Sequence, residues 1–107
     1  KEAMSSSADF VQYIVDQTAE AGRITVRKMM GDYCLYCDGV VVGLICDNCL
    51  YIKPTDAGRE LLCEVVMRRP YDGAKEYFLI TDVDKRDYLA AIVKTTVANL
   101  PAPKPKR

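Results

Sequence analysis

The chain has 107 residues, half of them hydrophobic and 28% charged, with five cysteines and no histidine. This length and apolar content are typical of one folded domain with its own core, and they exclude a chain that is disordered throughout. No apolar run reaches the roughly 20 residues that a membrane helix needs. The lack of histidine also removes the usual general base and mixed cysteine–histidine zinc sites.

The formal net charge of zero is unevenly distributed along the chain. Residues 101–107 hold three cations and no anion, so residues 1–100 carry 12 Lys and Arg against 15 Asp and Glu. Domains that bind nucleic acids normally present a basic face to the phosphates. The acidic body therefore argues against direct nucleic-acid binding. We expect a single domain over residues 5–100, followed by a disordered Pro/Lys tail over residues 101–107.

The first half of the chain predicts one helix and four strands. Apolar residues at helical spacing follow a cap at Ser6 and stop before Gly22. Strands are expected over residues 24–28, 32–37, 40–46 and 50–53, with a bend at Gly31. Two-residue turns are expected at Asp38 with Gly39 and at Asp47 with Asn48, because these residue types tolerate positive φ. Such short connections predict an antiparallel meander.

The second half predicts a helix, a strand and a final helix. The second helix is expected to open at Thr55 and to bury a stripe up to Val66, with Arg68 at its C-terminal end. A strand over residues 77–80 precedes the last helix, which Thr81 or Asp82 would cap. One continuous face of that helix is expected to pack in the core, formed by Leu89, Ile92, Val93, Thr96, Val97 and Leu100. The order α-β-β-β-β-α-β-α gives an α+β, two-layer domain whose helices cover one face of an antiparallel sheet.

Both faces of this sheet are expected to be apolar. In a regular register Tyr33 and Tyr51 lie on one face and Tyr36 on the other, each among aliphatic residues. Three helices can cover only one face. The second face therefore predicts either a docked protein partner or a second copy of the chain, unless loops and long side chains cover it.

Four cysteines form two Cys-x2-Cys pairs, Cys34 with Cys37 and Cys46 with Cys49, which is the spacing of a four-cysteine zinc site. The predicted turns place Cys37 and Cys46 at opposite ends of one strand, roughly 20 Å apart. Cys34 and Cys37 would also lie on opposite faces of the sheet. We therefore interpret these cysteines as small strand residues in a reducing cytoplasm and expect no cofactor. A small zinc-binding or thiol-redox module remains the alternative hypothesis.

Residues 27–36 (RKMMGDYCLY) resemble the signature near the start of the TfoX N-terminal domain, a bacterial family in which an arginine precedes Met-Phe-Gly and a tyrosine-containing strand. Residues 51–54 (YIKP) and 70–75 (PYDGAK), with the strand that follows them, are also similar to that family. The likeness covers roughly residues 5–100. Met30 stands where the family usually has phenylalanine.

The resemblance implies a fold shared with type III secretion chaperones, and regulation of competence for DNA uptake. The named regulators of the family are transcriptional co-activators that act alongside the cyclic-AMP receptor protein without known catalysis. We therefore predict a non-enzymatic, cytoplasmic protein-binding module whose partner is transcription machinery or a second copy of the chain. The residues predicted to form its surface are Arg27, Lys28, Met29, Met30, Gly31, Tyr33 and Tyr36.

Overall fold

The computed structural model describes residues 7–29 and 32–100. Within them it confirms the α+β fold and the four-stranded meander. The predicted cap at Ser6, the bend at Met30 and Gly31, and the tail over residues 101–107 lie outside the described residues. The elements in chain order are α1 (Ala8–Thr18), the 3-10 turn η1 (Ala19–Ala21), β1 (Ile24–Met29), β2 (Asp32–Cys37), β3 (Val40–Cys46), β4 (Cys49–Ile52), α2 (Asp56–Leu61), β5 (Met67–Arg68), β6 (Tyr77–Ile80) and α3 (Arg86–Asn99).

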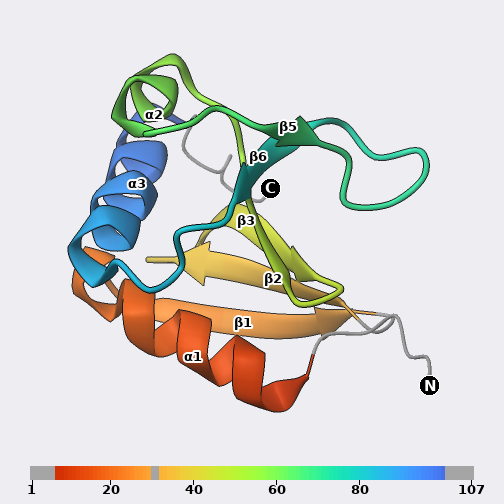
Figure 1. Ribbon diagram of the computed structural model, residues 1–107. Helices are drawn as coiled ribbons and strands as arrows, with labels where there is room; N and C mark the ends of the chain where they lie inside the picture. Colours follow the sequence, from red (N-terminus) through yellow and green to blue (C-terminus); the bar gives the residue numbers. More distant parts are fainter. Residues whose placement is uncertain (1–6, 30–31, 101–107) are drawn as a thin grey trace, which may run out of the picture.

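A six-stranded antiparallel sheet with the order β1-β2-β3-β4-β6-β5 forms one layer. The second layer consists of α1 and α3, which pack on one face of the sheet beside each other, with α2 against α3 (Figure 1). Their buried side chains, among them Ile14 and Ile92, share one core with Leu35, Leu50 and Phe78 of the sheet. In the part of the chain that the structure describes, no helix is long and apolar enough to cross a membrane.

Both predicted two-residue turns are confirmed. Asp38 and Gly39 have φ values of 52° and 83°, and Asp47 and Asn48 have φ values of 53° and 56°. Positive φ at both central residues matches the right-handed twist of the flanking strands, so these turns close narrow hairpins. The strands pair with the expected register beside each turn, Cys37 with Val40 and Cys46 with Cys49.

A bulge in β3 changes which face its later residues occupy. Tyr36 pairs with Val41 but Leu35 pairs with Gly43, so Val42 is an extra residue in β3. One extra residue moves every later side chain of the strand to the opposite face. The prediction that Tyr33 and Tyr51 share a face is therefore wrong. Tyr33 packs against the helix-side core, whereas Tyr51 and Tyr36 belong to the opposite face.

The second helix is shorter than predicted, and the predicted element order lacks one strand. The helix α2 ends at Leu61, and the chain then runs extended into β5, so Arg68 lies in a strand rather than at a helix end. The amide of Leu79 donates to the carbonyl of Val66 at 2.8 Å, which already begins the pairing of this segment with β6. Gly58 weakens a short helix, and β-branched residues such as Val65 favour strands.

The caps of the outer helices also differ from the prediction. The N-cap of α1 is Ser7, whose hydroxyl accepts a hydrogen bond from the amide of Phe10 at 3.1 Å. The last helix begins at Arg86, after an N-cap at Lys85 that makes no side-chain cap bond, so neither Thr81 nor Asp82 is its cap. Of its predicted stripe, Leu89, Ile92, Val93 and Thr96 are nevertheless buried, while Val97 and Leu100 are half-buried. Helix periodicity therefore located the buried faces better than it located the helix ends.

Candidate partner-binding surface

A hollow of about 280 Å³ lies where the end of β1 approaches the loop between β5 and β6. Figure 1 shows β1 ending on the side of the molecule from which this loop, residues 69–76, projects. The residues that line the hollow are Met29, Asp32, Tyr33, Leu44 and Tyr71. Met29 is 47% exposed and Tyr71 is 55% exposed, so two large apolar side chains at the edges of the hollow are in contact with solvent.

Strand pairing and the loop both position these side chains. Met29 is the last residue of β1 and pairs with Asp32 of β2, while the thiol of Cys34 lies 3.6 Å from the Met29 sulfur. Tyr71 follows Pro70, whose carbonyl accepts a weak hydrogen bond from the Cys46 thiol at 3.3 Å. The loop thus contacts β3 directly, and residues far apart in the sequence meet around one depression.

The predicted surface residues are only partly brought together. Met29 and Tyr33 line the hollow, and Arg27 and Lys28 are exposed on β1 beside it. Tyr36 is half-buried on the outer face and does not line the hollow. Met30 and Gly31 lie outside the described residues. A binding role for these residues stays a prediction.

Three of the lining residues were not among the predicted surface residues, namely Asp32, Leu44 and Tyr71. Tyr71 lies in a loop, and no local pattern connects it to Met29. Leu44 lies after the bulge in β3, which changes the β2 residue that it faces, so a regular register does not place it correctly. The useful signal for Tyr71 was its aromatic character in a polar loop, since an exposed aromatic side chain is a frequent anchor for a partner.

The sheet face opposite the helices carries its own apolar cluster, which we call the outer-face cluster. Its buried members are Cys34, Leu44, Cys46 and Tyr51, and Tyr36, Cys49, Tyr77 and Leu79 are partly buried against them. Leu44 belongs both to this cluster and to the hollow. The hollow is therefore continuous with the outer-face cluster through Leu44, and it exposes one end of that cluster to solvent.

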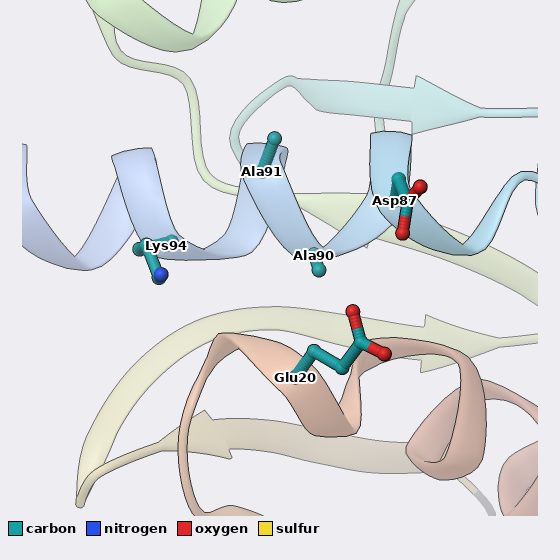
Figure 2. Close-up of a pocket in the computed structure, with 5 residues that line it drawn as sticks. All are labelled: Glu20, Asp87, Ala90, Ala91 and Lys94. Carbon is teal, nitrogen blue, oxygen red and sulfur yellow. The ribbon is translucent and has the colours of Figure 1, made fainter.

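A second depression of about 240 Å³ lies between η1 and α3 and differs in character. Glu20 forms an ion pair with Arg86 at 3.6 Å beside it, and small alanine side chains let the two elements approach each other. Its mixed charges and small side chains indicate a packing groove between two helices, without an exposed apolar anchor. Figure 2 shows the residues that line it, Glu20, Asp87, Ala90, Ala91 and Lys94.

The four paired cysteines do not converge. The thiol of Cys37 lies on the helix side of the sheet, 3.7 Å from the carbonyl of Ala21, whereas Cys34, Cys46 and Cys49 belong to the outer-face cluster. A tetrahedral zinc site needs all four sulfurs about 2.3 Å from one ion. This geometry therefore does not support a four-cysteine site. Cys63, which belongs to neither Cys-x2-Cys pair, is exposed.

The environment of Cys46 also argues against a redox role. Burial, then the neighbouring carboxylate of Asp32 and the charge of Asp47, raise the pKa of the Cys46 thiol from 9.0 to about 12. Burial likewise raises the pKa of Cys37. Thiolates, not thiols, attack disulfides, so redox-active cysteines need a lowered pKa. Cys46 therefore behaves as a buried apolar residue at neutral pH.

The raised pKa of Cys46 predicts a loss of stability at alkaline pH. An unfolded chain releases the thiol proton near pH 9, while the folded chain keeps it up to about pH 12. The contribution of the protonated Cys46 thiol to the free energy of unfolding is therefore complete below pH 9 and decreases as the pH rises from 9 towards 12. Urea denaturation at several pH values should show a shallower alkaline decline for Cys46→Ser than for the wild type. Parallel declines would contradict this assignment.

A family model of the TfoX N-terminal domain matches residues 16–100, which include every strand, α2, α3 and the end of α1. The chain belongs to the TfoX N-terminal domain family. The match includes the end of β1 and the 69–76 loop, so the whole hollow lies within the TfoX N-terminal domain.

A relative of this TfoX N-terminal domain is found in Spirochaeta aurantia. It is named an uncharacterized 12.7 kDa protein in the trpE 5′ region, and it is 41% identical over 105 residues. The aligned region covers 97% of this chain and 91% of the relative. The two proteins are thus similar along nearly their full lengths, and the relative's name assigns no activity.

Proposed function

We propose that this TfoX N-terminal domain is a non-enzymatic, cytoplasmic protein-binding module that regulates transcription in competence for DNA uptake. Family membership supports the regulatory role, since the named regulators of the family are transcriptional co-activators. The hollow beside β1 supports the binding role. Transcription machinery, including RNA polymerase and the cyclic-AMP receptor protein, is the partner that this role requires.

The observation that carries the proposal is the pair of exposed apolar side chains, Met29 and Tyr71, at the edges of the hollow. Fully burying a side chain of this size stabilises a complex by about 1.5–3 kcal/mol relative to leaving it in water. Methionine adapts its shape to a partner, and tyrosine adds a hydroxyl that can form hydrogen bonds. A partner residue that enters the hollow would also contact Leu44, at the end of the outer-face cluster.

Substitutions at the edges of the hollow should weaken binding to purified RNA polymerase or cyclic-AMP receptor protein. We expect Met29→Ala and Tyr71→Ala each to raise the Kd by about thirtyfold, the lower limit for alanine substitution at an interface hot spot. Biolayer interferometry with the full chain measures this change. Leu61→Ala is the matched control, since Leu61 is 41% exposed but lies on α2.

The control decides the interpretation of this experiment. Equal affinities for the wild type and both hollow variants would contradict the proposed binding surface. An equal loss for Leu61→Ala would indicate a general effect on the fold. Sedimentation of the free chain tests the other occupant, because a dimer that Tyr71→Ala dissociates would assign the hollow to a second copy.

A further inference from the structure

One edge of the sheet is open along β1. Within residues 7–29 and 32–100, β1 pairs only with β2, and Figure 1 shows it as the outermost strand. Its second half is exposed at Arg27, Lys28 and Met29. The opposite edge strand, β5, has only two residues. β1 is therefore the longer of the two edges.

The pairing of β1 shows which main-chain groups face this edge. The amide of Asp38 donates to the carbonyl of Arg23 at 2.9 Å, so residues 23 and 38 form a hydrogen-bonded pair. In an antiparallel ladder such pairs alternate with pairs whose main-chain groups point outwards. With the observed register, Arg27 directs its amide and carbonyl to β2, whereas Val26 and Lys28 direct theirs to the edge.

The charge at this edge is positive and is not neutralised within the described chain. Arg27 and Lys28 are both exposed, and the structure gives neither of them an ion pair or hydrogen bond with a residue that it describes. The residues opposite them on β2 are Cys34 and Tyr33, so no carboxylate lies directly opposite either side chain. A ligand that brings carboxylates to this edge would therefore find two cationic side chains that no described residue neutralises.

We propose that β1 accepts an extended acidic segment of a protein partner as an additional strand of the sheet. The main-chain groups of Val26 and Lys28 would form the ladder hydrogen bonds, and carboxylates of the segment would pair with Arg27 and Lys28. An apolar side chain of the same segment would contact Met29 and enter the hollow. This inference deepens the proposed function and rests on it for the identity of the surface.

Amide hydrogen exchange, followed by NMR on the full ¹⁵N-labelled chain, tests this mode of binding. The probe is an octapeptide of glutamate and valine with glutamates at consecutive positions, so that carboxylates can reach Arg27 and Lys28 on the two faces of the strand; it is added to saturation. We expect the amides of Val26 and Lys28 to exchange at least about tenfold more slowly with the peptide, because each becomes hydrogen-bonded. The amide of Arg27, already paired with β2, should change much less.

Three comparison probes separate strand addition from simple charge attraction. A valine–lysine octapeptide should not protect the edge, and neither should the glutamate peptide with a central proline, which lacks an amide donor. Equal protection by either peptide, or protection of Arg27 alone, would overturn the proposal. Protection of Val26 and Lys28 by a single-stranded DNA oligonucleotide, without protection by the acidic peptide, would also overturn it in favour of nucleic acid.

A variant of the protein provides a second test that preserves the charges and the hollow. Val26→Pro removes an amide that is expected to face solvent, so the fold should tolerate it and peptide binding should be lost. If this variant fails to fold, a glutamate peptide with N-methylated amides provides the same test from the side of the peptide. It lacks the amide donors that would bond to β1, so it should not bind. Because the peptide tests contain no transcription protein, their result is independent of whether RNA polymerase binds the hollow.

Discussion

Gly43→Ala should unfold most of the population or reduce the free energy of unfolding by about 3 kcal/mol or more. A Cβ atom at this position would lie 2.0 Å from the carbonyl oxygen of Tyr51 and 3.1 Å from the Cα of Ile52. Both contacts are with the backbone of β4, which cannot rotate away as a side chain can. Gly43 sits between β2 and β4, paired with Leu35 and Ile52 beside the bulge. Urea denaturation followed by circular dichroism measures the loss.

Gly39→Ala is the matched control for this prediction. Nothing lies within 4 Å of a Cβ atom at Gly39, but its φ of 83° is in the left-handed region. The same substitution there should cost only about 1–2 kcal/mol from backbone conformation. If the two variants lose equal stability, β4 must move away from β3 at little cost, and the close approach at Gly43 would not be a constraint.

Phe78→Ala should reduce the free energy of unfolding by about 3–5 kcal/mol, a large part of the 5–15 kcal/mol typical of a domain. Phe78 is fully buried in β6, where the sheet meets the helices. The guanidinium of Arg59 lies 5.7 Å from the centre of its ring, so removing the ring also removes this cation–π contact. Thermal and urea denaturation should both report the loss, with an m-value close to that of the wild type.

Leu79→Ala provides the comparison from the neighbouring position of the same strand. Its side chain points to the other face, where it is only partly buried against the outer-face cluster. We expect a loss of about 1–2 kcal/mol, since folding removes less apolar surface of Leu79 from water. A loss as large as that of Phe78→Ala would mean that the outer face is packed as completely as the helix face.

Much of the fold was predictable because its signals are local. The pairs Asp38 with Gly39 and Asp47 with Asn48 tolerate positive φ, and this property alone places two turns and the register beside them. The apolar spacing of α1 and α3 located their buried faces, since helical periodicity is a property of adjacent turns. The resemblance of residues 27–36 to the TfoX N-terminal domain was also local, and the family match confirms it.

The errors arose where the outcome depended on distant residues. The extended segment after Leu61 pairs with β6 through Val66, and this pairing competes with continuation of α2. The hollow likewise requires the 69–76 loop to approach the end of β1, so Tyr71 could not be linked to Met29 from the sequence. Neither contact leaves a periodic pattern, because the partners lie far apart along the chain.

The sequence alone therefore determined the hairpins, the helical faces and the family of this protein, all of which follow from short-range chemistry. Only the tertiary structure decided which sheet face each side chain occupies after Val42 and which residues form the hollow. The physical reason is the two-residue period of a strand: one bulged residue reverses every later position. At Gly43, next to the bulge, β3 also packs closely against β4. This contact is between strands and does not come from a local conformational preference of the sequence.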